Sequence, residues 1–452
     1  MNLREAQAWL DRHINLEANA GRPQGASLER MRDIARVLGD PQQAYPSIHI
    51  TGTNGKGSTA RIATALLTTA GLTAGTYTSP HLEHINERIS RNLEPISDDE
   101  LAAAFSAVAA IEPIIGEPPS HFEILTAAAF HWFADVAVDV AVLEVGLLGR
   151  YDCTNIVDAT VAVLTRVAAD HTDRSEGWRR AIAAEKVGIV KPGSTFVLGE
   201  TDPDLRDIFD AAPAAEMWVR DTDFGVGANR VAVGGRLLDI RTPGGSYDDL
   251  FLPLHGAHQG DNAACALTAV EAFFGRALDE DLVTEAFATV TVPGRLEAVA
   301  HSPSVMLDAA HNPDGAEALT QALADSFTVV GSRYLVVGLL AQQDPAEMLA
   351  ALDARGYDLV LVCTPDSPRA RPAARVAEVA AGMGVTVEVV PDPVEAVGRA
   401  VALADDEDLV VVAGSIYVVG AVRAAYSRQA EVIATAAAQA DADDMGDDGR
   451  YL

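Results

Sequence analysis

A glycine-rich turn between an apolar run and a helical pattern carries the residues best suited to chemistry. The run Ser47–Thr51 ends in Gly52-Thr-Asn-Gly-Lys-Gly-Ser58. Glycine allows positive φ and a close approach of the backbone, and the free N–H groups of the turn and of the next helix N-terminus favour an anion. The turn therefore predicts a phosphate cradle in which Lys56 contacts the β- and γ-phosphates and Ser58 reaches Mg²⁺. The strict P-loop pattern is not met, because Gly57 separates Lys56 from Ser58.

Lysine is rare in this chain, so its positions are informative. Of the 33 lysine and arginine residues, only Lys56, Lys186 and Lys191 are lysines. Arginine cannot replace a compact ammonium on a phosphate, and it cannot act as a neutral amine toward CO₂ or a carbonyl. A chemical role is therefore favoured for Lys56, with a general loss of lysine through coding bias or salt adaptation as the alternative. For Lys186 the alternative is a solvated helical lysine.

Polar side chains follow two further apolar runs. Glu144 lies at the end of the run 139–145, and His171 follows the run 160–165. The carboxyl ends of parallel strands face the ligand crevice, so Glu144 is predicted to hold Mg²⁺ beside the phosphates. The alternatives are a structural carboxylate for Glu144 and a core or surface histidine for His171.

Length and charge limit the class of protein. The 452 residues predict two or three domains, and the net charge of −32 disfavours nucleic acid or an anionic membrane as a partner. The three cysteines are far apart and lack metal-site spacing, which is typical of a reduced cytoplasmic protein. The sequence shows no leader pattern and no long apolar segment. We expect a cytoplasmic monomer with small-molecule partners.

The elements that must position these residues alternate in type. Helical patterns at 3–13, 28–38, 58–70, 97–111, 122–135, 179–190 and 261–274 are interleaved with apolar runs at 47–51, 73–78, 139–145 and 160–165. This alternation predicts an α/β fold with a P-loop-type, doubly wound ATP-binding domain over residues 1–294. Residues 224–254 are predicted to form β-hairpins packed on the sheet edge.

Strand and helix patterns alternate again in the second part of the chain. They predict a smaller Rossmann-like α/β domain over residues 295–428, without a glycine cradle of its own. Residues 429–452 form an acidic tail of low complexity, which we expect to be disordered.

Nine motifs, in this order along the chain, resemble those of the folylpolyglutamate synthase/dihydrofolate synthase family of the Mur ligase superfamily. They are Thr51-Gly-Thr-Asn-Gly-Lys-Gly-Ser58, Ser79-Pro-His-Leu82, Glu144-Val-Gly146 with Gly149-Arg150, Asp170-His-Thr172, Glu185-Lys-Val-Gly-Ile189, His258-Gln259 with Asn262-Ala-Ala264, Pro293-Gly-Arg-Leu-Glu297, Asp308-Ala-Ala-His-Asn-Pro-Asp-Gly315 and Gly414-Ser-Ile-Tyr417. Several are specific to this branch of the superfamily.

The resemblance implies a ligase that uses ATP to phosphorylate the carboxylate of dihydropteroate or a reduced folate and joins L-glutamate to it as an amide. It implies ATP contacts from Asn54, Gly55, Lys56, Gly57, Ser58, Asn262, Arg295 and Asp308. It implies Mg²⁺ ligands Ser79, Glu144 and His171, and catalytic roles for Lys56, for Lys186 as a carbamylated lysine, and for His311. It implies substrate contacts from Ser120, His121, Phe122, Glu123, Tyr151, Asp152, Cys153 and Ser415.

Some of these assignments have alternatives within the sequence itself. Phe122 could stack on a pterin and Glu123 could accept from its ring N–H groups, or Phe122 is helix core and Glu123 an exposed first-turn acid. The chain also departs from the family pattern, with Leu148 and Cys153 at positions where the family has small residues.

Two other functions are compatible with parts of the sequence. One is a Mur-type ligase that joins an amino acid to a non-folate acid, and the other is a non-catalytic ATP-binding protein. The complete set of Lys56, Glu144, His171 and Lys186 disfavours the second.

Overall fold

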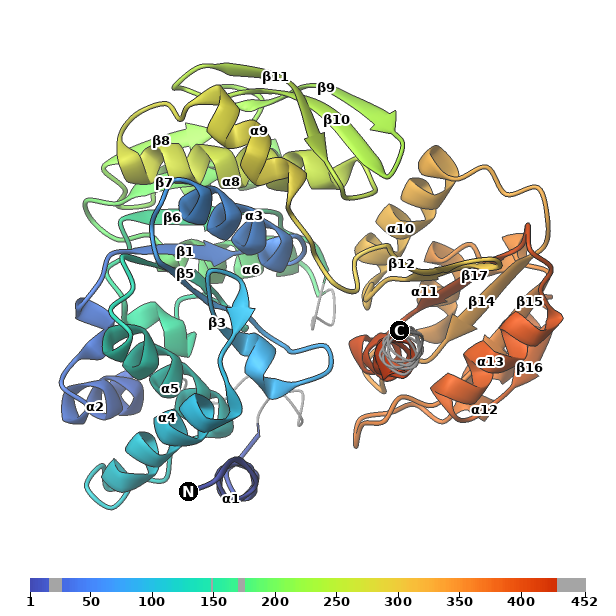
Figure 1. Cartoon of the computed structure of the whole chain (residues 1–452), viewed down its shortest axis with the longest axis horizontal. Helices are drawn as coiled ribbons and strands as arrows, with labels where there is room; N and C mark the ends of the chain where they lie inside the picture. The colour runs from blue at the N-terminus through green and yellow to red at the C-terminus, as the bar shows by residue number, and fades with distance from the viewer. Residues whose placement is uncertain (16–26, 148, 170–174, 429–452) are drawn as a thin grey trace, which may run out of the picture. The chain divides into compact units, whose positions relative to one another are not determined.

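The structure, a computed structural model, describes residues 1–15, 27–147, 149–169 and 175–428. Within these ranges the chain divides into two compact units (Figure 1). The first contains Met1–Pro293 and Glu317–Phe327, and the second contains Gly294–Ala316 and the chain from Thr328 onward. Two sequence-predicted features, His171 and the tail at 429–452, lie outside the described residues.

The first unit is built on an eight-stranded sheet with the order β4-β3-β2-β5-β1-β6-β7-β8. Strand β1 (Ser47–Thr51) is fully buried and lies parallel to both of its neighbours, β5 (Val140–Glu144) and β6 (Val161–Leu164). The other parallel strands are β2 (Ala74–Tyr77), β7 (Thr195–Leu198) and β8 (Glu216–Val219). The antiparallel edge consists of β3 (Ile89–Arg91) and β4 (Glu94–Pro95).

Helices cover both faces of this sheet. Ile48 and Ile50 of β1 pack in a cluster with one helix layer, whereas Ala141 and Leu143 of β5 pack with the other. The first layer is α3 (Lys56–Thr69), α8 (His258–Phe274) and α9 (Glu280–Ala288). The second layer is α1 (Leu3–Leu10), α2 (Glu29–Val37), α4 (Asp98–Ile111) and α5 (His121–Asp135), with α6 (Trp178–Lys186) and α7 (Arg206–Asp210) beside β6 and β7. Strands buried on both faces explain the nearly continuous apolar runs.

The hairpin region forms a separate small sheet. Its antiparallel strands are β9 (Gly225–Ala232), β10 (Gly235–Arg241) and β11 (Ser246–Leu252). Their apolar residues join the cluster of α3, α8 and α9, so the expectation that they pack on the edge of the main sheet is wrong. Figure 1 shows this sheet above α8 and α9.

The second unit contains a six-stranded sheet with the order β12-β13-β17-β14-β15-β16. The strands are β12 (Glu297–His301), β13 (Ser304–Leu307), β14 (Arg333–Val337), β15 (Leu359–Val362), β16 (Val387–Val389) and β17 (Leu409–Ala413), and only β12 is antiparallel to its neighbour. The helices after Pro293 are α10 (Pro313–Ser326), α11 (Pro345–Ala351), α12 (Ala373–Gly382), α13 (Pro393–Leu403) and a helical stretch at 416–428. The predicted α/β fold class is confirmed for both units.

The structure differs from several local predictions. Helix α3 begins at Lys56, not Ser58, because Gly55 takes a left-handed conformation and serves as the N-cap. Helix α6 ends at Lys186, followed by a short 3₁₀ turn at Val187–Ile189. Strands β7 and β8 were not predicted. Among the described helices, none is long and apolar enough to cross a bilayer.

A buried histidine in β1 connects the central strand to the loop that follows β5. His49 is fully buried, and its Nε2 lies 2.8 Å from Thr154 Oγ1. Burial, with a smaller contribution from the nearby Lys191 charge, lowers the pKa of His49 to about 3. His49 is therefore neutral in the folded protein at neutral pH.

This histidine should make stability depend on pH. In the unfolded chain its pKa returns to about 6.5, so between pH 3 and 6.5 the unfolded state binds more protons. The free energy of unfolding should therefore rise with pH in that window, by at most about 1.4 kcal/mol per pH unit from this group. The free energy of unfolding, measured with denaturant at several pH values, should depend less steeply on pH in His49→Gln than in wild type. The control is His301→Gln, a substitution at an exposed histidine. Equal pH slopes of the free energy of unfolding in His49→Gln and wild type would contradict the assignment.

Candidate active site

The glycine-rich turn forms a buried to half-buried loop at the start of α3. Gly52 and Gly55 have φ of 152° and 87°. A Cβ on Gly52 would lie 1.9 Å from Thr165 Oγ1, and one on Gly55 would lie 2.2 Å from Asn262 Oδ1. Only glycine therefore fits at either position, and the first N–H groups of α3 lie directly after the loop. This is the geometry of an anion site.

Lys56 is the first residue of α3 and folds back over the loop. Its Nζ donates to the carbonyl of Thr53 at 3.0 Å, and the side chain is half-buried. Ser58, the third residue of α3, is buried. Both side chains are therefore at the loop, as the sequence predicted, and Lys56 supplies a positive charge beside the helix N-terminus.

Oxygen groups suited to a hard cation lie on the other side of the loop. Glu144 ends β5 next to β1, and its carboxylate is 5% exposed. Its Oε2 lies 3.4 Å from an ideal Cβ on Gly57 and accepts from the backbone N–H of Ser79 at 3.3 Å. The Ser79 hydroxyl is buried and has no hydrogen-bond partner among the described residues. A carboxylate and a hydroxyl of this kind fit Mg²⁺, although the described residues contain no cluster of three acidic, histidine or cysteine ligands.

Lys186 lies under the same loop. It is the last residue of α6, is 7% exposed, and donates through Nζ to the Gly52 carbonyl at 2.6 Å. Gly149 allows the chain after β5 to reach this point, since a Cβ there would be 2.5 Å from the Glu185 carbonyl oxygen. Two of the three lysines therefore meet at one loop.

The N-terminal part of α8 completes this group of residues. Asn262 is buried beside Gly55, and its Nδ2 donates to Gln259 Oε1 at 3.0 Å. The loop itself is supported by Thr165, whose hydroxyl donates to the Asn54 carbonyl at 2.7 Å. Thr165 was not predicted as a site residue, although a threonine at the end of a buried strand is the same signal that identified Glu144.

The predicted pterin residues at the start of α5 have local structural partners. Ser120 is the N-cap and forms a capping box with Glu123. The Glu123 carboxylate accepts from the Ser120 backbone N–H at 2.7 Å and from Arg30 Nε at 2.8 Å. The idea that Glu123 is an exposed first-turn acid is wrong, because the side chain is 4% exposed. His121 is also buried, and Phe122 is half-buried with its ring against Gly146.

The loop after β5 holds the remaining predicted pterin residues. Tyr151 is 44% exposed, whereas Asp152 is buried and accepts from the backbone N–H groups of Leu147 at 2.9 Å and Thr154 at 3.0 Å. Cys153 is partly buried, and desolvation raises the pKa of its thiol. Leu148 lies outside the described residues. This loop therefore presents Tyr151 to solvent and uses Asp152 to fix its own shape.

In the second unit, the predicted residues gather at the carboxyl ends of β13 and β17. Asp308 is buried and accepts from the N–H groups of Leu296 and Ala310 at 2.9 and 2.8 Å. Burial raises the pKa of Asp308, and the charge of the half-buried Arg295 opposes that rise. His311 Nδ1 lies 3.0 Å from the Ala309 carbonyl oxygen.

Ser415 lies in the turn after β17 and is fully buried. The turn contacts the β13 end through Gly414, whose N–H donates to the Ala310 carbonyl at 3.1 Å. Gln343 joins both, since its Nε2 donates to the carbonyls of His311 and Gly414 at 2.7 and 2.9 Å. The second unit thus brings Arg295, Asp308, His311 and Ser415 to one group of loops.

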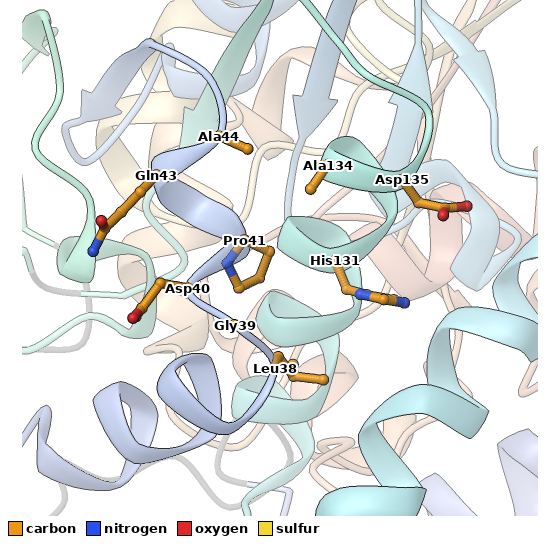
Figure 2. A pocket seen from close by; sticks show the side chains of 9 residues that line it. All are labelled: Leu38, Gly39, Asp40, Pro41, Gln43, Ala44, His131, Ala134 and Asp135. Carbon is orange, nitrogen blue, oxygen red and sulfur yellow. The ribbon is translucent and has the colours of Figure 1, made fainter.

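A surface pocket in the first unit lies away from all of these residues (Figure 2). It is lined by Leu38, Gly39, Asp40, Pro41, Gln43, Ala44, His131, Ala134 and Asp135. None of the sequence-predicted site residues contributes to it, so it plays no part in the assignment.

Comparison with known proteins agrees with the geometry. Residues 50–270 match the Mur ligase middle domain, and residues 294–416 match the Mur ligase, glutamate ligase domain. The dihydrofolate synthase/folylpolyglutamate synthase of Mycobacterium tuberculosis is 43% identical over 374 residues, which cover 76% of this chain and 75% of that protein.

Solved structures are similar over nearly the whole chain. Mycobacterium tuberculosis folylpolyglutamate synthase complexed with ADP has a TM-score of 0.88 at 38% identity, covering 94% of this chain and 98% of that one. The bifunctional folylpolyglutamate synthase/dihydrofolate synthase from Yersinia pestis, complexed with AMPPNP and a Mn ion, has a TM-score of 0.82 at 30% identity, covering 94% and 98%. The chain therefore belongs to the dihydrofolate synthase/folylpolyglutamate synthase family of Mur ligases, and it is an ATP-dependent ligase that forms an amide bond.

Proposed function

We propose that this protein adds L-glutamate both to dihydropteroate and to reduced folyl-glutamates. The convergence of Lys56, Lys186 and Glu144 on residues 52–58 of one unit supports the ATP-dependent step, and the similarity to dihydrofolate synthase/folylpolyglutamate synthases supports the choice of acids. Residues 1–294 would form the ATP-binding domain and residues 295–428 the glutamate-ligase domain.

The reaction would proceed through an acyl phosphate. A carboxylate oxygen of the acid attacks the γ-phosphorus of ATP, the bond to the β-phosphate oxygen breaks, and ADP leaves. The glutamate amine then attacks the acyl carbon, loses a proton, and expels phosphate to leave the amide. Such transfers need positioning and charge neutralisation more than covalent help from the protein.

The residues of the first unit divide these tasks. The N–H groups at 54–58, which include the α3 N-terminus, would hold the phosphates, and Lys56 would neutralise charge that develops on the transferred group. Asn262 would contact ATP beside Gly55. Ser79 and Glu144, together with His171, would hold Mg²⁺, which supplies charge neutralisation and orients the phosphates.

The residues of the second unit would serve the amine and the nucleotide. His311 and Ser415 would bind L-glutamate, and Arg295 and Asp308 would contact ATP. The pterin would be met by Phe122 and by the substrate loop that contains Tyr151, Asp152 and Cys153. The remaining residues assigned to substrate are Ser120, His121 and Glu123.

Removal of the Lys56 ammonium should abolish turnover without unfolding the protein. We expect Lys56→Ala to retain less than about a tenth of wild-type kcat, because a charged phosphate contact is lost at the transferred group. Lys191→Ala is the matched control, since the Lys191 ammonium donates to the Asn155 carbonyl and not to the loop. ATP-dependent phosphate release, with the thermal midpoint as a check of folding, measures both. Activity in Lys56→Ala comparable to the control would refute the phosphate role.

Lys186 has two candidate roles, and the variants Lys186→Arg and Lys186→Ala distinguish them. As a carbamate, formed when the neutral amine adds to CO₂ and releases a proton, it would be an anion near the metal, and Lys186→Arg should be as inactive as Lys186→Ala. If Lys186 is an ammonium that only anchors the Gly52 carbonyl, Lys186→Arg should retain substantial activity. We expect the first result, and a ¹³C resonance from ¹³C-bicarbonate that disappears in both variants. An active Lys186→Arg enzyme without that resonance would exclude the carbamate.

The two acid substrates can be distinguished directly. We expect phosphate release that requires L-glutamate with either dihydropteroate or a reduced folyl-glutamate. Extension of folates alone would make the protein a folylpolyglutamate synthase only, and inactivity with both acids would favour a Mur-type ligase for a non-folate acid. Glu123→Ala should raise KM for dihydropteroate more than for the folate. Glu117→Ala is the control, because it removes an exposed carboxylate that also pairs with Arg30 and is not assigned to the substrate.

A further inference from the structure

The segment 165–168, which follows β6, holds two successive residues of the phosphate loop, Thr53 and Asn54. The Thr165 hydroxyl donates to the Asn54 carbonyl at 2.7 Å, and the Arg166 carbonyl accepts from the Thr53 N–H at 2.7 Å. The backbone of Ala168 contacts the Thr53 hydroxyl through both its N–H and its carbonyl, each at 3.1 Å. The position of the loop therefore depends on the position of this segment.

The segment is itself held at its middle residue, Val167, by a buried carboxylate. Glu200 follows β7, is 7% exposed, and accepts from the Val167 N–H at 2.7 Å through Oε2. Its Oε1 accepts from the N–H groups of Thr201 and Asp202, each at 3.0 Å. Arg179 of α6 donates to the Val167 carbonyl at 3.3 Å and lies 3.5 Å from Glu200 Oε2.

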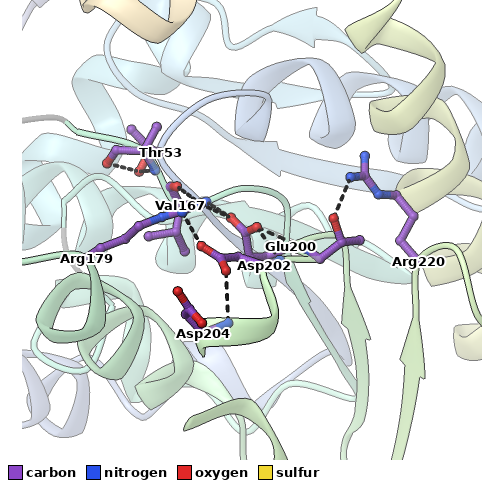
Figure 3. A network of polar contacts seen from close by, with 9 residues as sticks. Thr53, Val167, Arg179, Glu200, Asp202, Asp204 and Arg220 are labelled. Atoms are coloured by element: carbon purple, nitrogen blue, oxygen red, sulfur yellow. Dashed lines mark hydrogen bonds and ion pairs between the residues drawn. The ribbon is translucent and has the colours of Figure 1, made fainter. Parts of the chain in front are cut away.

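Figure 3 shows these contacts as one network, with Val167 between Thr53 on one side and Glu200 and Arg179 on the other. Both polar backbone atoms of Val167 are therefore held by side chains from β7 and α6. Three backbone N–H groups point at the Glu200 carboxylate, so the site requires an acceptor at both oxygens.

We propose that Glu200 is a positioning residue for nucleotide binding, acting through Val167 and Thr53 on the phosphate loop. This inference rests on the proposed role of that loop. Among the described residues, the polar contacts of Glu200 are with Val167, Thr201, Asp202 and Arg179, and not with the loop, Ser79 or Glu144. Its effect should therefore fall on the orientation of the loop N–H groups. The nucleotide should then bind more weakly, whereas L-glutamate, assigned to the second unit, should be unaffected in KM.

The substitution Glu200→Gln tests this with little change of volume. Its amide would turn an NH₂ group toward at least one backbone N–H and would lose the ion pair with Arg179. We expect ADP, measured by calorimetry in the full-length protein, to bind about tenfold more weakly, as for loss of a buried hydrogen bond to a charged group. We also expect faster hydrogen exchange at the Val167 and Thr53 amides, with KM for L-glutamate within about twofold of wild type.

A second pair of variants guards against misfolding of Glu200→Gln. Arg179→Gln removes the partner of Val167 and Glu200, and it should weaken ADP binding in the same direction. Arg180→Gln is the matched control from the same helix, because Arg180 pairs with Asp207 at the surface. It should leave ADP affinity unchanged.

The outcomes separate this inference from the proposed function. If Lys56→Ala weakens ADP binding while Glu200→Gln and Arg179→Gln lower only the thermal midpoint, Glu200 is structural and the inference is wrong. If Lys56→Ala has no effect on ADP binding, the phosphate role of the loop itself fails. Weakened ADP binding in Lys56→Ala, Glu200→Gln and Arg179→Gln, but not in Arg180→Gln, supports both.

Discussion

The proposed phosphate loop depends on a packing constraint at two glycines. Thr165 Oγ1 and Asn262 Oδ1 occupy the space where side chains of Gly52 and Gly55 would lie, at 1.9 and 2.2 Å from the ideal Cβ positions. Glycine has wide backbone freedom in an unfolded chain. Because these two glycines are enclosed, that freedom does not make the folded loop mobile. The loop is held on both sides, which is the preorganisation that electrostatic stabilisation requires.

The charge of the molecule makes this local arrangement necessary. With a net charge of −32, the protein as a whole repels the anions that it uses as substrates. Positive potential must therefore come from groups close to the ligand, and Lys56 contacts the loop directly. Its ammonium group adds to the partial charge at the α3 N-terminus. The surrounding acidic surface then affects solubility more than binding.

The sequence predicted the elements whose patterns are local, and it was least accurate where contacts are not. The glycine turn, the Glu144 strand and the helix predicted at 97–111 follow from residue types and spacing, and all are present. The start of α3 was misplaced because the left-handed Gly55 serves as its N-cap and places Lys56 inside the helix. The partner of Glu123 could not be predicted, since Arg30 is 93 residues distant in the chain.

Two strand-end glutamates show why a sequence signal of this kind does not by itself give a role. Glu144 and Glu200 both follow buried apolar strands, and both carboxylates are nearly inaccessible to solvent. Glu144 ends β5, which pairs directly with β1, so its carboxylate lies beside the loop and a buried hydroxyl. Glu200 follows β7, which is separated from β1 by β6, so it meets the backbone of the segment after β6. The strand order, which is set by long-range pairing, decides which carboxylate can face a ligand and which must support the chain behind it.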